Sequence, residues 1–190
     1  MKTVAVLVGS LGKNSINAIF AKTLEKLADS RLAFDYLDIG ALPHYNNDLW
    51  EAPPAAVTQF KAQVDNADAV LIVMPEFNRS FPGVIKNALD WGSRPWGKNS
   101  WAGKPVSVVG TTPGATGTAA GQTHLRAVLP VFNMIVMGQP EVYFQTKPGL
   151  IDEEYNVTDD SSRVFLAGYI DTFTRFIDHH GPRELAIAAE

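Results

Sequence analysis

Four short runs of almost uninterrupted apolar residues constrain the fold of this chain more than any other feature of its sequence. They are rich in valine and isoleucine and occupy residues 3–8, 69–74, 105–109 and 134–137. Strands that are covered on both faces have this composition, and such strands are typical of parallel sheets. A fifth segment, residues 32–40, alternates polar and apolar side chains, which suits a strand at the edge of a sheet.

Amphipathic helical patterns separate these expected strands. After the first run, apolar side chains at spacings of four, four and three share one helical face: Ile16, Phe20, Leu24 and Leu27. Asn14 or Ser15 is the expected N-cap of that helix. Further helices are expected at residues 55–66, 82–89, 118–129 and 162–179.

The alternation of strands and helices indicates βαβ crossovers, and therefore a parallel sheet with helices on both faces. We expect an α/β fold: a flavodoxin-like three-layer α/β/α sandwich with a five-stranded parallel sheet of order 2-1-3-4-5. Residues 1–190 are expected to form it as a single domain. In that order the first, third and fourth strands are neighbours. The loops at their carboxyl ends then meet at the place where such sheets bind ligands.

Composition narrows the classes of function. A net charge of −4 gives no basic face for a nucleic acid, so no such partner is expected. The chain has no cysteine, which excludes disulfides and thiolate chemistry, so redox activity would need a cofactor. The histidines show no metal-site spacing, and no metal is expected. No run approaches the roughly 18 apolar residues of a membrane span, and we expect a soluble cytoplasmic protein without a membrane partner.

The loop after the first expected strand, residues 9–17, reads GSLGKNSIN and suggests a phosphate site. The Walker pattern fails on spacing, because only two residues separate Gly9 from Gly12, and the G-x-G-x-x-G pattern is also missing. What remains is a polar loop that enters a helix, where Ser10, Ser15 and Asn17 can donate hydrogen bonds to an anion. An ordinary strand-to-helix turn capped by the same residues is the open alternative.

The segment after the second buried run, residues 75–91, reads PEFNRSFPGVIKNALDW. Two prolines, Pro75 and Pro82, bracket a short stiff stretch that offers backbone amides to the polar edge of a flat ring. Glu76 is either a general base or a carboxylate that orders the backbone. We favour the second role, because nothing in the sequence gives Glu76 a catalytic partner.

These two segments, together with AGKPVSVVGTTPG at residues 102–114, resemble the NAD(P)H-dependent FMN reductase family, in particular its quinone and chromate reductase branch. The resemblance spans roughly residues 3–137, with the three motifs in order. It implies FMN as cofactor, NADH or NADPH as co-substrate and a small-molecule electron acceptor. It also implies a homodimer or homotetramer.

The resemblance further implies which residues contact FMN. From the three loops these are Ser10, Gly12, Lys13, Ser15, Ile16 and Asn17; Pro75, Glu76, Phe77, Asn78, Arg79 and Ser80; and Thr112, Pro113 and Gly114. Two positions depart from the family pattern, which commonly has arginine where Gly12 stands and tyrosine where Phe77 stands. The missing arginine is expected to lower the affinity for the phosphate. The missing tyrosine hydroxyl removes a polar contact near the ring.

The reaction expected from this resemblance is hydride transfer through FMN to quinones, and to acceptors such as chromate, azo or nitro compounds and free flavin. No catalytic side chain is expected, because the flavin carries the chemistry, although Arg79 is a candidate contact for a nucleotide phosphate or an anionic acceptor. The alternative for Arg79 is a surface role paired with Glu76 or with solvent. For the whole protein, the alternatives are a flavodoxin-type electron carrier and a regulatory or scaffold domain that has lost FMN.

Other segments leave their roles open. Trp91, Trp96 and Trp101 either pack in the core, wall a flat pocket or form a subunit contact, and core or interface packing is the more frequent role. Residues 138–155 are long for a simple connection, and we expect them to cover a partner subunit.

Overall fold

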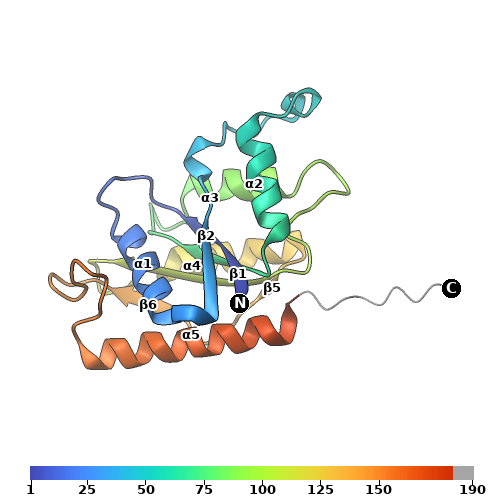
Figure 1. Cartoon of the computed structure of the whole chain (residues 1–190). Helices are drawn as coiled ribbons and strands as arrows, with labels where there is room; N and C mark the ends of the chain where they lie inside the picture. Colours follow the sequence, from blue (N-terminus) through green and yellow to red (C-terminus); the bar gives the residue numbers. More distant parts are fainter. Residues whose placement is uncertain (182–190) are drawn as a thin grey trace.

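A computed structural model of the chain describes residues 1–181; residues 182–190 of the expected domain lie outside the described residues. The sheet has the strand order β2-β1-β3-β4-β5, with all neighbouring strands parallel (Figure 1). This confirms the predicted order 2-1-3-4-5. The strands are β1 (Lys2–Val8), β2 (Leu32–Tyr36), β3 (Ala69–Val73), β4 (Pro105–Thr112), β5 (Ile135–Val136) and β6 (Val142–Gln145).

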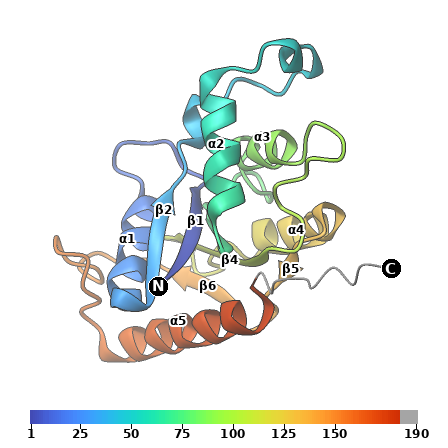
Figure 2. The same cartoon turned by 45° about the vertical axis from the view of Figure 1, so that its right-hand side comes forward.

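The helices form a layer on each face of the sheet (Figures 1 and 2). One core cluster packs α2 (Ala55–Asn66), α3 (Gly83–Gly92) and α4 (Ala119–Val128) against one face. The other cluster packs α1 (Ile16–Ala28) and α5 (Asp160–His180) against the opposite face. Because β3 is buried along its whole length, its sequence reads as an unbroken apolar run, as parallel strands covered on both faces do.

The far edge of the sheet differs from the expectation. Residues 138–155 were expected to be a long connection, but they contain β6, which pairs with the second half of β4. The expectation that this segment covers a partner subunit stays a prediction. The first half of β4 pairs with β5, so two short strands share one edge position and the sheet has six strands. Between them, the Arg126 guanidinium donates to the carbonyl oxygens of Val108 and Met137, at 3.1 and 2.6 Å.

Two of the three tryptophans near the end of α3 belong to the core. Trp91 and Trp101 are fully buried, and their indole N–H groups donate to the carbonyl oxygens of Pro43 and Leu89. Trp101 lies so close to Gly92 that a Cβ there would come within 2.3 Å of the indole ring. Trp96, in contrast, is 89% exposed.

Within residues 1–181, no helix combines the length and the apolar character that crossing a lipid bilayer requires.

Candidate functional site

Three loops meet at the carboxyl ends of β1, β3 and β4, which are adjacent in the sheet, and enclose a cavity of about 470 Å³. Most of the cofactor-site residues predicted from the sequence line it. The lining consists of Ser10, Gly12, Asn14, Ser15, Ile16, Asn17, Pro75, Glu76, Phe77, Thr111, Thr112 and Pro113. Five predicted residues do not line it: Lys13, Asn78, Arg79, Ser80 and Gly114. Asn14 and Thr111 line the cavity although the sequence did not single them out for it.

The first loop ends in the N-terminus of α1. Ser15 is the N-cap: its Oγ accepts a hydrogen bond from the amide of Ala18 at 3.2 Å, and its own amide donates to the carbonyl of Gly12. The amides of Ile16 and Asn17 lie in the first helical turn, where no carbonyl of the same helix precedes them. With the helix dipole, these groups favour an anion at this corner of the cavity.

Asn17 has a role that the sequence did not reveal. Its side chain is 1% exposed and bonds to the backbone of Thr111 through both polar atoms, as donor to the carbonyl and as acceptor from the amide, each at 3.0 Å. We expected this side chain to donate to a phosphate. The end of β4 runs beside the first turn of α1, so the carboxamide ties the two segments together. This contact uses one of the two Nδ2 hydrogens, and donation by Asn17 to a phosphate stays a prediction.

The second loop is a tight hairpin. Phe77 and Ser80 exchange both backbone hydrogen bonds, at 2.9 and 3.0 Å, and Asn78 and Arg79 form the tip with φ of 51° and 66°. These angles match a type I′ turn, in which asparagine is favoured at the first position. The amides of Phe77 and Ser80 are therefore committed to each other rather than to a ring edge. Phe77, 54% exposed, presents its side chain at the cavity.

Glu76 fixes this hairpin to the neighbouring helix. One carboxylate oxygen accepts from the amide of Gly121 in the first turn of α4 at 3.0 Å, and the other lies 3.5 Å from the guanidinium of Arg79. The Glu76 side chain is 12% exposed, whereas that of Arg79 is 79% exposed. These contacts support the backbone-ordering role favoured for Glu76, and they pair Arg79 with Glu76 at the rim of the cavity.

The third loop leaves β4 very close to β3. A Cβ at Gly110 would come within 2.1 Å of the carbonyl oxygen of Met74, so this approach requires glycine. Beyond it, Thr112 and Pro113 line the cavity, and the side chain of Gln145 donates to the Pro113 carbonyl at 2.9 Å. The strand β6, absent from the predicted sheet, therefore supports this loop.

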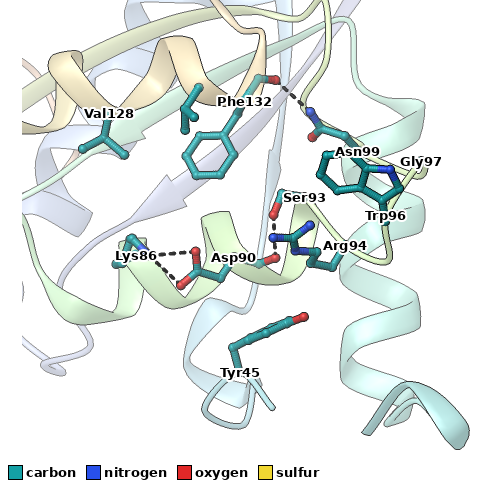
Figure 3. Close-up of a pocket in the computed structure, with 11 residues that line it drawn as sticks. Tyr45, Lys86, Asp90, Ser93, Arg94, Trp96, Gly97, Asn99, Val128 and Phe132 are labelled. Carbon is teal, nitrogen blue, oxygen red and sulfur yellow. Dashed lines mark hydrogen bonds and ion pairs between the residues drawn. The ribbon is translucent and has the colours of Figure 1, made fainter. Parts of the chain in front are cut away.

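A second and larger cavity, of about 780 Å³, lies beside α3 and α4 (Figure 3). Its walls include Tyr45, Trp96 and Phe132, and an ion pair between Lys86 and Asp90 at 2.7 Å borders it. The three strand-end loops do not contribute to its lining. Parallel α/β sheets bind ligands at the carboxyl ends of their strands, so the smaller cavity is the candidate site despite its size.

The histidines and acidic residues do not form a further centre in the described part of the chain. Within residues 1–181, no group of three or more such side chains is placed to hold a metal ion. His124, on α4, instead pairs with Ser80: its Nδ1 and the Ser80 Oγ are 2.8 Å apart.

The sequence of the chain is similar to that of known reductases. The family model of the NADPH-dependent FMN reductases matches residues 1–149. A 2-hydroxy-1,4-benzoquinone reductase from Burkholderia sp is 44% identical over 174 residues, covering 92% of this chain and 95% of that protein. A quinone reductase from Pseudomonas putida is 43% identical over 176 residues, covering 92% of this chain and 94% of that protein.

Solved structures of flavoenzymes and FMN oxidoreductases are similar in fold to this chain. The flavoenzyme NAD(P)H:acceptor oxidoreductase FerB from Paracoccus denitrificans is 47% identical with a TM-score of 0.94, covering 96% of this chain and all of that chain (100%). The apo form of the NADH:FMN oxidoreductase EMOB is 20% identical with a TM-score of 0.67, covering 92% of this chain and 89% of that chain. The second likeness shows the shared fold alone.

Proposed function

The chain belongs to the NADPH-dependent FMN reductase family, and from that premise we propose that it is an FMN-dependent NAD(P)H:quinone oxidoreductase. The observation that carries the proposal is the convergence of three strand-end loops and the N-terminus of α1 on one cavity. Further acceptors of the same chemistry are chromate, azo or nitro compounds and free flavin. The quinone reductases and the benzoquinone reductase among its relatives support quinones as the main acceptor class.

The donor set suits the phosphate of FMN. The hydroxyls of Ser10 and Ser15 and the first-turn amides of Ile16 and Asn17 are hydrogen-bond donors to an anion at the positive end of a helix. Among residues 1–181, Glu76 supplies the one carboxylate in the cavity lining, and it is tied to Gly121 and Arg79. A phosphate without a metal ion is the ligand that these groups match.

The other two loops are proposed to hold the ring. When bound, FMN supplies the redox chemistry, taking a hydride from NADH or NADPH and passing electrons to the acceptor. Phe77, Thr112 and Pro113 would border the ring and set the approach of both substrates. Positioning of this kind brings reacting atoms together without an acid–base constellation.

The visible spectrum of the purified protein tests the proposal. We expect a bound flavin spectrum, or its appearance after FMN is added, and bleaching of that spectrum by NADH or NADPH in the absence of oxygen. A protein that takes up no FMN would point to the regulatory or scaffold domain. A protein that holds FMN but is not reduced by either nucleotide would point to a flavodoxin-type carrier.

Assembly as a homodimer or homotetramer is part of the proposal. Trp96 and Val131 are 89% and 79% exposed at the larger cavity, and exposed apolar side chains that cluster are typical of interaction sites. Sedimentation of the wild type and of Trp96→Asp would test this surface: the variant is expected to shift toward monomer. A wild type that sediments as a monomer would contradict the proposal. A cytoplasmic location remains a prediction.

A further inference from the structure

The hairpin Phe77–Ser80 is held in place from outside by α4, at two points. Glu76, just before the hairpin, accepts from the amide of Gly121, and Ser80, its last residue, pairs with His124 one helical turn further along α4. The two contacts lie on either side of the short stem. The position of the hairpin at the mouth of the cavity therefore depends on α4 rather than on β3 alone.

The contact with His124 has two components. The Ser80 Oγ and the His124 Nδ1 are 2.8 Å apart, and the rings of Phe81 and His124 meet edge-on with centroids 5.1 Å apart. A serine hydroxyl can donate or accept, so the pair forms whichever nitrogen of the imidazole carries the proton. A Cβ at Gly121 would come within 3.0 Å of the Ser80 carbonyl oxygen, which shows how closely the helix approaches the hairpin.

The hairpin needs this support because of its backbone. Asn78 suits its positive φ, but Arg79 is a non-glycine residue at a φ of 66° without that preference, and such a conformation persists when the surroundings impose it. The stem contributes a single residue pair, Phe77 with Ser80. A turn with so little pairing of its own is fixed by its external contacts.

We propose that His124 is a positioning residue for the reaction: through Ser80 it holds the hairpin so that Phe77 and Arg79 stand at the path of the nicotinamide nucleotide. This inference rests on the proposed function. His124 does not line the strand-end cavity, so its effect on the site passes through Ser80 and Phe81. The phosphate contacts lie in another loop, and they are expected to be independent of His124.

Four variants test the inference. His124→Ala and Ser80→Ala remove the contact, His124→Asn keeps a polar atom near the position of Nδ1, and Thr123→Ala is the matched control. Thr123 is the exposed neighbour of His124 on α4. Its hydroxyl donates to the Ala119 carbonyl of the same helix and also contacts the Tyr143 hydroxyl, and both partners lie outside residues 76–81. Hydrogen exchange of residues 76–81 in the FMN-loaded protein reports directly on the two amides of the hairpin. Steady-state kinetics then relate the hairpin to nucleotide binding.

We expect His124→Ala and Ser80→Ala to speed exchange in residues 76–81 and to raise KM for NAD(P)H about fivefold, the equivalent of one hydrogen bond. The FMN dissociation constant should stay within about twofold. His124→Asn should restore both exchange and KM, and Thr123→Ala should match the wild type.

Two results would overturn the inference. One is unchanged exchange of residues 76–81 in His124→Ala, and the other is faster exchange with an unaltered KM. Failure of the proposed function is a separate result, because it would appear as a wild type that binds no FMN or oxidises no NAD(P)H. The exchange of the hairpin would still be measurable in that unloaded protein.

Discussion

The two cavities of this molecule invite comparison because the larger one is not at the site of the proposed chemistry. The cavity beside α3 and α4 is about 780 Å³ and is lined by apolar and polar residues alike, whereas the strand-end cavity is about 470 Å³. The smaller one has a helix N-terminus and loops from three adjacent parallel strands. The difference teaches that a helix N-terminus and adjacent parallel strand ends, rather than cavity volume, single out the cavity that we propose as the anion site.

Each cavity contains an asparagine that bonds to the backbone through both ends of its carboxamide. At the strand ends, Asn17 joins α1 to Thr111. At the larger cavity, Asn99 donates to the Phe132 carbonyl (Figure 3) and accepts from the Trp101 amide. The two residues therefore offer a matched pair of substitutions that separate the cavities.

The largest expected effect is that of Asn17→Ala. It leaves the amide and carbonyl of Thr111 buried without partners, and we expect the free energy of unfolding to fall by about 2–4 kcal/mol. FMN affinity should fall with it, because the substitution frees the N-terminus of α1 from β4. Urea unfolding and FMN titration measure both quantities.

Asn99→Ala is the control for this substitution. It should lower stability by a smaller amount, because Asn99 is only half-buried, and it should leave FMN affinity unchanged. Loss of FMN binding in Asn99→Ala but not in Asn17→Ala would reverse the assignment of the two cavities.

Gly12→Arg is expected to have the next largest effect, in the opposite direction. Apart from Gly12 and its two chain neighbours, no heavy atom of residues 1–181 lies within 4 Å of a Cβ built at Gly12, which lines the strand-end cavity, so a long side chain has room there. An arginine can add a charge-assisted hydrogen bond to the phosphate, and we expect FMN to bind about tenfold more tightly. Gly12→Ala is the control and should bind FMN like the wild type. Equal affinities of all three proteins would argue against a phosphate at this loop.

A smaller effect is expected at the rim of the same cavity. Arg79→Gly removes the guanidinium but suits the turn, since Asn-Gly is a favoured pair in type I′ hairpins. We expect KM for NAD(P)H to rise about fivefold if the guanidinium contacts the nucleotide, the value of one hydrogen bond. Arg163→Ala removes another exposed arginine that pairs with a carboxylate three residues away, and it should have wild-type kinetics. Identical KM values would return Arg79 to a surface role.

The smallest effect concerns the N-cap of α5, which lines neither of the two cavities. Asp159 caps α5, and hydrogen bonds from the side chain of Ser161 and the amide of Ser162 lower its pKa from 3.8 to about 2. A lowered carboxyl pKa stabilises the folded state above pH 4, and this contribution is lost as the pH falls from about 4 to about 2. Thermal unfolding should show a smaller loss over that range in Asp159→Asn than in the wild type.

Ser15→Ala provides the contrast for that measurement. The Ser15 hydroxyl caps α1 without titrating, so its removal should lower stability by about 1 kcal/mol at every pH. A pH-dependent difference between Ser15→Ala and the wild type would contradict this account of the α1 cap.

Most of the fold could be predicted because local sequence patterns indicate its strands and helices. Apolar runs marked β1, β3 and β4, and helical spacing marked α1 and α5. The strand β6 was not predicted. Its residues nevertheless alternate as in a strand: Val142 and Phe144 are buried, and Tyr143 and Gln145 are partly exposed. The strand was missed because it follows β5 after a short break and occupies the same edge of the sheet.

The candidate site could be predicted only in part. The loops were placed correctly, because parallel neighbours bring their carboxyl ends together. The bond between Asn17 and Thr111, which are 94 residues apart, has no local signal, and neither have the contacts of Glu76 and Ser80 with α4. Local patterns therefore placed Asn17 in the first loop but could not indicate its bond to β4.

The sequence by itself determined the elements, their order along the chain and the three polar loops at strand ends. Only the tertiary structure decided which polar atoms in those loops remain for a ligand. Hydrogen bonds between distant segments engage the Oδ1 and one Nδ2 hydrogen of Asn17 and one carboxylate oxygen of Glu76. The physical reason is that buried polar groups must pair, and their partners are set by the packing of the chain rather than by its neighbouring residues.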